Sequence, residues 1–313
     1  MKQYVFGADI GGTTVKLGCF TVEGELLDKW EITTRKEEDG RFILPDVAES
    51  IQAKIAERSL DRETIAGVGI GVPGPVKDDG TVTGCVNLGW GEVNVETEAE
   101  KLLGLPVKVG NDANMASLGE MWQGGGKGFQ SIVMVTLGTG VGGGIIINGK
   151  MVSGTNGAGG EIGHICVDDS ETETCGCGNK GCLEQYCSAT GIVRMAGKEL
   201  ENTDAPSSLR EIPGVSARDV FDAAKQGDAL ALSLVEKHGK ILGRALAGIA
   251  CVCDPEAFVI GGGVSRAGDI LLSTLAKYYR QHAFHACKNT VFTLASLGND
   301  AGIYGCAAAI LTK

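Results

Sequence analysis

Three cysteines and one histidine near the middle of the sequence have the types and spacing of a metal site. Cys175, Cys177 and Cys182 lie in the run Cys-Gly-Cys-Gly-Asn-Lys-Gly-Cys, and His164 lies eleven residues before the first of them. Three thiolates and one imidazole form a complete tetrahedral ligand set for Zn²⁺, which predicts a structural zinc ion rather than a water-activating one. The alternative is a group of free thiols, which would be prone to oxidation.

Three glycine-rich turns, each following an apolar stretch, could bring backbone N–H groups close to phosphate oxygens. The first turn is Gly11-Gly12-Thr13-Thr14, the second is Gly138-Thr139-Gly140 and the third is Gly261-Gly262-Gly263. Without Cβ atoms the backbone can approach a phosphate, so the three turns together indicate a nucleotide, although each alone could be a tight hairpin. None fits a P-loop or a Rossmann unit, because no Lys-Ser/Thr follows the glycines and the first two lead into a predicted strand.

Two carboxylates follow predicted strands and could take part in catalysis. Asp9 ends an apolar stretch beside the first turn, where it could face a metal–phosphate complex. Asp112 follows Asn111 at the end of another predicted strand. A carboxylate in that place could accept the proton of a substrate hydroxyl, which is general-base catalysis worth roughly 10²–10⁴-fold in rate. The alternative for each is the cap of a helix or turn.

The elements expected around these residues alternate between strands and helices, which is typical of an α/β protein. Strands are predicted at 4–9, 15–20, 65–72, 105–109, 132–135, 144–147 and 258–260, and helices at 44–59, 113–122, 216–225, 230–250 and 301–311. Asp9 and Thr136 hold equivalent places in two strand–turn–strand units, which indicates a weak internal repeat. We expect a small N-terminal α/β domain at 1–116 and a larger α/β domain with the zinc motif at 117–300. The terminal helix, at about 301–313, is expected to pack back on the first domain.

The composition argues against a nucleic-acid-binding, membrane or secreted protein. With 28 Lys+Arg against 39 Asp+Glu, the net charge of −11 argues against non-specific binding to nucleic acid or to an anionic membrane. Glycines interrupt the long uncharged stretch at 131–149, so no membrane span is expected, and the N-terminus has no secretory pattern. We therefore expect a cytoplasmic protein with reduced cysteines, in which Cys251 and Cys253 are small residues of a helix core.

Together these motifs resemble the ROK family of sugar kinases and repressors, in particular its zinc-containing, ATP-dependent bacterial glucokinase branch. The resemblance extends over essentially the whole chain. It rests on four segments in order: Asp9-Ile-Gly-Gly-Thr-Thr, Leu137-Gly-Thr-Gly-Val-Gly-Gly-Gly, Gly159-Gly160-Glu161-Ile-Gly-His164, and Cys175 to Glu184. It implies the actin-like, ribonuclease-H-like ATPase fold, with two α/β domains around a central cleft, which agrees with the internal repeat.

The resemblance also implies roles for individual residues. Asp112 matches the catalytic base, and Asp9 matches the position that holds Mg²⁺. The implied sugar-binding residues are Asn87, Asn111, Asp112, Glu161, His164 and Glu184. The residues implied to bind ATP are Gly11, Gly12, Thr13, Thr14, Thr139 and Gly140 at the phosphates, Gly262 and Gly263 at the adenosine, and Lys16 by likeness to the wider actin-like superfamily. The implied zinc ligands are His164, Cys175, Cys177 and Cys182.

The reaction implied by the resemblance is transfer of the γ-phosphoryl group of MgATP to the 6-hydroxyl of glucose, in a protein expected to be a homodimer. One alternative is a kinase of another hexose, such as N-acetylmannosamine, mannose, fructose or allose. The other is a sugar-sensing regulator of the same family. Such regulators carry an N-terminal helix-turn-helix, for which we expect no room before the strand that begins near Tyr4, and the acidic charge disfavours DNA binding.

Overall fold

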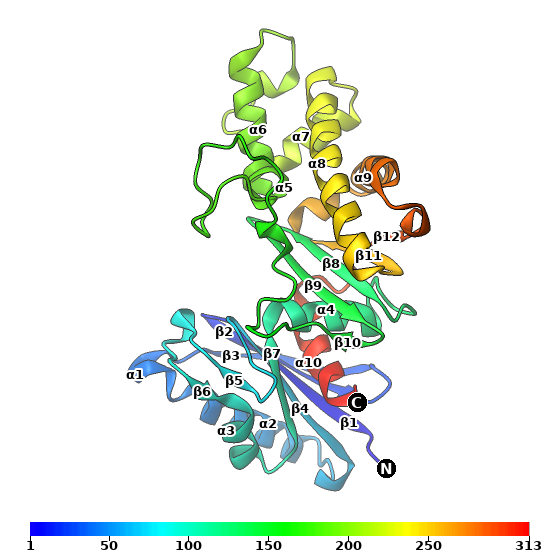
Figure 1. Ribbon diagram of the computed structural model, residues 1–313. Coiled ribbons are helices and arrows are strands. Elements are labelled where there is room, and N and C mark those ends of the chain that lie inside the picture. Colours follow the sequence, from blue (N-terminus) through cyan, green and yellow to red (C-terminus); the bar gives the residue numbers. More distant parts are fainter. Residues whose placement is uncertain (313) are drawn as a thin grey trace. The chain divides into compact units, whose positions relative to one another are not determined.

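Two mixed β-sheets with the same strand order organise the chain (Figure 1). The computed structural model describes residues 1–312. The order is β3-β2-β1-β4-β7 in the first sheet and β10-β9-β8-β11-β12 in the second. In each sheet the strand that comes first along the chain is central, which confirms the internal repeat predicted from the sequence.

The bounds of the elements are as follows. The strands of the first sheet are β1 (Tyr4–Ile10), β2 (Thr14–Thr21), β3 (Leu26–Thr33), β4 (Ile65–Val72) and β7 (Val107–Asn111). Those of the second are β8 (Ile132–Leu137), β9 (Val141–Ile147), β10 (Lys150–Met151), β11 (Ala257–Gly261) and β12 (Val291–Leu294), and β5 (Thr81–Val82) pairs with β6 (Val93–Asn94). The helices are α1 (Glu37–Gly40), α2 (Ile43–Glu57), α3 (Val95–Leu103), α4 (Asp112–Gln123), α5 (Glu184–Cys187), α6 (Ala189–Asn202), α7 (Ala217–Lys225), α8 (Ala229–Cys253), α9 (Asp269–His282) and α10 (Ala301–Leu311).

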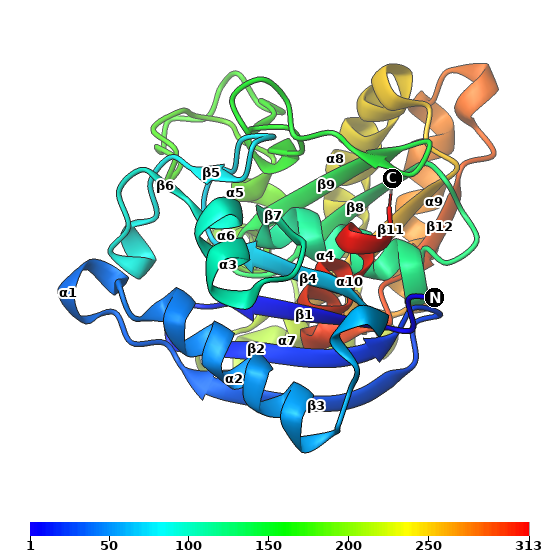
Figure 2. The same cartoon turned by 90° about the horizontal axis from the view of Figure 1, so that it is seen from below.

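The first sheet is covered on both faces, by α2 on one and α10 on the other (Figure 2). Strand alternation explains this, because Phe6 and Ala8 of β1 join the core under α2 while Val5 packs with α10. Helix α10 lies directly on the strands: a Cβ atom at Gly69 would lie 1.7 Å from the carbonyl oxygen of Cys306. Strands β1, β4 and β7 are parallel, so their carboxyl ends share one edge.

The second sheet has a parallel centre in which β11 pairs with β8 and with β12. Every residue of β11 is buried. Three aromatic side chains pack helix α9 against this sheet. Phe258 of β11 stacks on Phe292 of β12 at 5.3 Å and meets Tyr279 of α9 edge-on at 5.6 Å. Helix α8 packs along α9 and α7.

Chain contacts divide the structure into two compact units. Unit 1 contains Met1–Gln130, Gly144–Gly160 and the chain from Ser296 onward, and unit 2 contains Ser131–Gly143 and Glu161–Ala295. Helix α4 belongs to unit 1 because it packs tightly on α10. The predicted domain boundary at residue 116 lies inside α4 and stays a prediction, and Lys313, the end of the predicted terminal helix, lies outside the described residues.

A capping box marks the start of helix α7 in the sequence and in the structure. The Ser216 side chain accepts the N–H of Asp219, while the Asp219 carboxylate accepts the N–H of Ser216, which forms the capping box at the start of the helix. The helix predicted at 301–311 is α10 with the same bounds. Among residues 1–312, no helix combines the length and the apolar character needed to cross a membrane.

Candidate active site and metal centre

Asp9 and Asp112 lie at the same edge of the first sheet, one strand apart. Asp9 pairs with Gly71 of β4, whose own neighbour on β7 is Gly110, and Asp112 begins α4 directly after β7. Burial and the charge of Asp112 raise the pKa of Asp9 to about 6, although Lys16 opposes the shift. Asp112 is solvent-exposed. The protein packed around its carboxylate nevertheless raises its pKa, and the hydrogen bond from the N–H of Ala113 partly opposes this shift.

This shift predicts that Asp9 costs the protein stability at neutral pH. A carboxyl whose pKa is higher in the folded state, about 6 against 3.8, contributes stability when protonated, and that stability is lost as the pH rises through this window. The loss is on the order of 3 kcal/mol. Asp9→Asn should therefore raise the free energy of unfolding at pH 7.5 and leave it nearly unchanged at pH 4. Urea denaturation without Mg²⁺ or nucleotide measures this, and equal effects at both pH values would contradict it.

The first turn is a tight hairpin between β1 and β2, with Asn87 beside it. The N–H of Gly11 donates to the carbonyl of Thr14 at 3.0 Å, and the carbonyl of Thr13 accepts the N–H of Thr34 at 2.9 Å. A Cβ atom at Gly12 would lie 3.7 Å from the carbonyl oxygen of Asn87. The structure therefore brings a predicted sugar-binding residue against a predicted phosphate-binding turn.

Helix α10 and Lys16 complete the surroundings of Asp9. A Cβ atom at Gly302, in the first turn of α10, would lie 2.4 Å from Oδ2 of Asp9, so the glycine lets the helix N-terminus approach the carboxylate. Lys16 is the partner of Asp9 across the hairpin, and its Nζ donates to the carbonyl of Asn299 at 3.1 Å.

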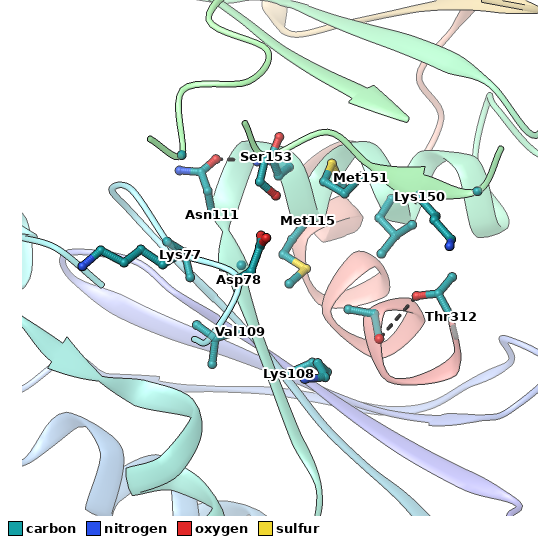
Figure 3. Close-up of a pocket in the computed structure, with 17 residues that line it drawn as sticks. Lys77, Asp78, Lys108, Val109, Asn111, Met115, Lys150, Met151, Ser153 and Thr312 are labelled. Atoms are coloured by element: carbon teal, nitrogen blue, oxygen red, sulfur yellow. Dashed lines mark hydrogen bonds between the residues drawn. The ribbon is translucent and has the colours of Figure 1, made fainter. Parts of the chain in front are cut away.

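Asn111 was predicted to bind sugar, and its side chain also makes structural hydrogen bonds. Its Oδ1 accepts the N–H groups of Ala113 and Asn114 at 3.0 and 3.2 Å, which caps α4, and its Nδ2 donates to the carbonyl of Gly74 at 3.1 Å. Asn111 also borders a pocket of about 260 Å³ in unit 1, with Ser153 and Met115 (Figure 3). Of the predicted sugar-binding residues, this pocket contains only Asn111.

In unit 2 the second turn is joined to Glu184. The N–H of Gly138 closes the turn by donating to Gly140 at 3.0 Å, and the N–H of Val141 donates to Oε2 of Glu184 at 3.0 Å. A Cβ atom at Gly140 would lie 2.3 Å from that oxygen. Gly140 is therefore needed for Glu184 to approach the backbone of the turn.

The third turn packs on the end of β8. Gly262 has a φ of +81°, and a Cβ atom there would lie 2.5 Å from the carbonyl carbon of Leu137. Gly263 has no such neighbour, since nothing lies within 4 Å of its Cβ position. The two glycines therefore play different roles, although both were predicted to bind adenosine.

This difference predicts unequal costs of substitution. Gly262→Ala combines an unfavourable φ with a backbone clash and should lower the free energy of unfolding by about 2–5 kcal/mol. Gly263→Ala is the matched control and should change it by less than about 1 kcal/mol. Urea denaturation of both variants is the measurement. Equal stability of the two variants would mean that the close approach at Leu137 is absent.

A pocket of about 590 Å³ opens beside Gly263 in unit 2. Its wall includes Ser216, Phe221 of α7 and three charged residues, Arg218, Asp222 and Arg266, of which Arg218 pairs with Asp222 at 3.2 Å. Its volume falls in the range of small-molecule sites. It can hold a nucleoside next to the third turn, and none of its α7 residues was predicted as a site residue.

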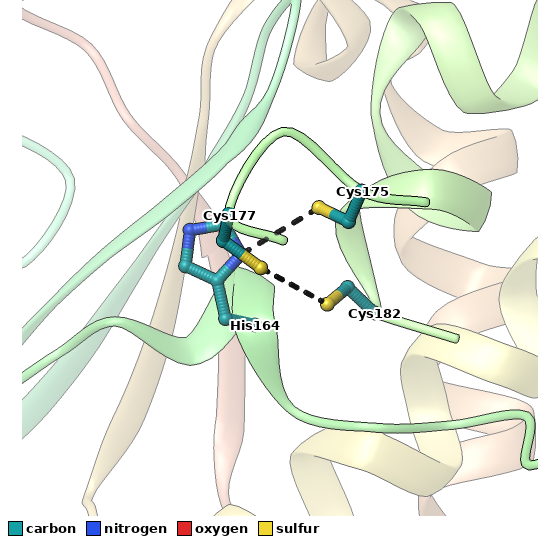
Figure 4. Close-up of side chains that lie close together, drawn as sticks. All are labelled: His164, Cys175, Cys177 and Cys182. Atoms are coloured by element: carbon teal, nitrogen blue, oxygen red, sulfur yellow. Dashed lines mark hydrogen bonds between the residues drawn. The ribbon is translucent and has the colours of Figure 1, made fainter. Parts of the chain in front are cut away.

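The four predicted zinc ligands lie together (Figure 4). We call His164, Cys175, Cys177 and Cys182 the metal quartet; their ligand atoms all lie within 4.8 Å of one another. Cys177 Sγ and Cys182 Sγ are 3.6 Å apart, and Cys175 Sγ is 3.9 Å from His164 Nδ1. Bonds of about 2.3 Å from a tetrahedral zinc ion would place two sulfur atoms about 3.8 Å apart.

The electrostatics of the metal quartet also fit a cation. Burial and the neighbouring thiols raise the pKa of Cys182 to about 12, whereas the backbone N–H of Asn179 lowers the pKa of Cys177. A bound cation would offset the burial that disfavours the Cys182 thiolate. The donor set, three sulfurs and one imidazole nitrogen, is the one that zinc prefers. The other ring nitrogen of His164 lies 3.9 Å from Oε2 of Glu161, so the metal quartet adjoins a predicted sugar-binding residue.

The predicted sites therefore fall into groups within each unit. In unit 1 the structure places Asp9 near Asp112, and Asn87 against the first turn. In unit 2 it joins Glu161 to the metal quartet, and Glu184 to both the second turn and Cys175.

Comparison with known proteins identifies the family. Residues 5–313 of this chain match the ROK family. The glucokinase of Halalkalibacterium halodurans is 42% identical to it over 308 residues, which cover 97% of this chain and 93% of that protein. The chain belongs to the ROK family.

Solved ROK structures share the fold. The ROK family glucokinase from Streptomyces griseus in complex with glucose and AMPPNP is 35% identical, with a TM-score of 0.69 over 97% of this chain and 98% of that chain. A ROK family transcriptional regulator, a homologue of the E. coli MLC protein, is 26% identical, with a TM-score of 0.82 over 99% of this chain and 78% of that chain. The predicted actin-like α/β ATPase fold of this ROK chain is thus confirmed. Because a kinase and a regulator share the fold, the site must decide the activity.

Proposed function

We propose that this ROK protein is a glucokinase, which transfers the γ-phosphoryl group of MgATP to the 6-hydroxyl of glucose. The observation that carries the proposal is the solvent-exposed carboxylate of Asp112, held at the sheet edge beside Asp9. Similarity to the glucokinase of Halalkalibacterium halodurans supports glucose as the sugar. Similarity to the Streptomyces griseus glucokinase, whose complex contains glucose and AMPPNP, supports a nucleotide donor.

Asp112 acts in this proposal as the general base. Its Oδ1 accepts the N–H of Ala113 at 2.8 Å, which orients the carboxylate at the start of α4. The raised pKa makes its ionised form a stronger base than an ordinary aspartate, suited to take the proton of the sugar hydroxyl. Asn111 and Asn87 would donate hydrogen bonds to other hydroxyls.

Asp9 would hold Mg²⁺, for which an oxygen ligand of partly buried charge is suited. When bound, Mg²⁺ neutralises charge on the transferred phosphoryl group. Each glycine-rich turn offers backbone that can approach phosphate oxygens, and the 590 Å³ pocket beside Gly263 would take the nucleoside. Lys16 would add positive charge near Asp9.

We propose that the metal of the quartet is zinc and that it is structural. Four protein ligands leave no open position, so zinc would order the sugar site without touching the reacting oxygen. His164 would use one ring nitrogen for the metal and the other, near Glu161, for a sugar hydroxyl. Glu184, two residues after Cys182, would be positioned by the same centre. A homodimer is the expected assembly, to be measured by light scattering.

The proposal is tested by ADP release from MgATP, measured with glucose, mannose, N-acetylmannosamine, fructose and allose, and without sugar. We expect glucose to give the highest kcat/KM, well above the rate without sugar. If another hexose is used and glucose is not, the kinase assignment holds but the proposed substrate is wrong. If folded, zinc-loaded protein turns over none of them, the kinase assignment itself is wrong and a sensor role replaces it.

A further inference from the structure

The loop between the first two ligands of the metal quartet is strongly acidic. Residues 165–174 join His164 to Cys175 and contain Asp168, Asp169, Glu171 and Glu173 but no basic residue. The loop has little regular structure, with isolated bridges only at Cys166 and Thr174. Backbone hydrogen bonds hold its ends, from Val167 to Gly181 at 2.7 Å and from Leu183 to Ile165 at 2.8 Å, so what remains to be held is its acidic middle, where like charges repel.

Arg194 of α6 binds this acidic loop at two points. Its Nη2 lies 2.7 Å from Oε2 of Glu171, and its Nη1 lies 3.0 Å from Oε2 of Glu173. The side chain of Glu171 is only 6% exposed and that of Arg194 20%, so water weakens this pair less than a surface pair. The guanidinium also lies over the ring of Tyr186, 5.1 Å from its centre, which fixes its orientation.

Residues next to Cys182 hold the same loop. The hydroxyl of Tyr186 lies 2.7 Å from both Oδ2 of Asp168 and Oε2 of Glu171. The neighbouring Gln185 donates from Nε2 to the carbonyl of Glu173 at 2.9 Å and accepts the N–H of Cys182 with Oε1 at 3.1 Å. The acidic loop is therefore fastened to the segment that carries the last ligand of the metal quartet.

We propose that Arg194 is a positioning residue for the metal centre, which fastens the acidic loop so that His164 and Cys175 are held at binding distance before the metal arrives. The inference rests on the proposed zinc site. Arg194 compensates the negative charge of the loop, and its planar fork holds two carboxylates in a fixed geometry, whereas a lysine offers a point charge on a flexible stem. Preorganised ligands bind more tightly because less ordering accompanies binding.

Zinc affinity of the purified full-length protein, measured by competition with a chromophoric chelator, tests this inference. Arg194→Met keeps the length of the side chain and removes the fork, and we expect it to weaken zinc binding by about 10- to 100-fold. Arg194→Lys keeps the positive charge but loses the rigid fork, and should fall between this variant and the wild type. In both variants the KM for glucose should rise, whereas kcat at saturating zinc and glucose should stay within about twofold, since neither changes Asp112.

Three further variants separate positioning from general stability. Tyr186→Phe removes one hydroxyl from the same cluster and should also weaken zinc binding, so the inference stays testable if Arg194→Met fails to fold. Lys198→Met removes an exposed pair with Glu173 and should have little effect. Asp228→Asn weakens the cap of α8, away from the acidic loop, and should lower stability without changing zinc affinity.

The possible results test the role of Arg194 separately from the proposed zinc site. If Arg194→Met and Tyr186→Phe bind zinc as tightly as the wild type, Arg194 is not a positioning residue although the metal site stands. Arg194 also loses this role if Asp228→Asn weakens zinc binding as much as they do. If the wild type itself does not bind zinc, the proposed metal site is wrong and the role of Arg194 is wrong with it.

Discussion

Asp112→Asn is expected to lower kcat by about 10²–10⁴-fold while leaving the affinity for glucose within about threefold of wild type. The amide has the shape of the carboxylate, and its oxygen can still accept the N–H of Ala113, so the start of α4 should be preserved. What it lacks is the ability to take a proton from the sugar hydroxyl. Steady-state kinetics and calorimetric titration of glucose measure the two quantities separately.

Glu63→Gln is a matched control, because it removes one negative charge from an exposed position in unit 1, in the turn before β4. Its kcat should remain near that of the wild type. The wild-type rate should also fall at acid pH, with an apparent pKa above the ordinary aspartate value, since the pKa of Asp112 is raised. Near-native turnover in Asp112→Asn would remove this residue from the mechanism.

Removal of the metal is expected to weaken glucose binding by at least about tenfold and to spare nucleotide binding. Predicted sugar-binding side chains touch the metal quartet: Glu161 through His164, and Glu184, whose Oε1 lies 3.7 Å from Cys175 Sγ. The nucleoside pocket is lined by other residues, at the start of α7 and after the third turn. Calorimetric titrations of glucose and of AMPPNP, with metal-loaded and chelator-treated protein, compare the two affinities.

Two controls accompany this experiment. The circular dichroism spectrum must show that the metal-free protein is still folded, and added Zn²⁺ must restore the original affinity for glucose. If folded, metal-free protein bound glucose as tightly as before, the metal would not order the sugar site. A parallel loss of nucleotide affinity would point instead to loosening of unit 2 as a whole.

The metal quartet was predictable because its signal is local. Cys175, Cys177 and Cys182 lie within eight residues, and glycines between them permit a tight loop, so spacing alone indicated the site. The ends of β1 and β7 were predicted to within one or two residues for a similar reason, since an apolar run followed by a polar residue marks the end of a strand. The roles of the individual site residues stay predictions, which the experiments above test.

Several elements lacked a sequence signal. Helix α6 contains Gly191 and Gly197, which lower helix propensity, and α9 begins after Gly268 without a side-chain cap. Strand β12 has only four residues. Helix α3 and strand β3 were missed although signals were present: Asn94 and Gly104 bound α3, and in β3 charged residues alternate with partly buried ones. The interpretation of Cys251 as a core residue was wrong, because this thiol faces solvent at the end of α8.

Contacts between residues far apart in the sequence could not be predicted from local patterns. Glu120 is fully buried, and its carboxylate accepts the N–H groups of Gly125, Ser296 and Leu297 at 2.8–2.9 Å, which no spacing pattern could show. The contact of Glu184 with the second turn likewise joins segments more than forty residues apart. Such contacts depend on tertiary packing rather than on local sequence.

The most direct test of the proposed reaction is ³¹P NMR of the wild-type protein incubated with MgATP and glucose. We expect the γ-phosphate signal to be replaced by equal amounts of ADP and glucose 6-phosphate, and 6-deoxyglucose to yield no phosphate ester. Formation of inorganic phosphate alone, or of an ester at another hydroxyl, by folded and metal-loaded protein would contradict the proposed phosphoryl transfer to the 6-hydroxyl.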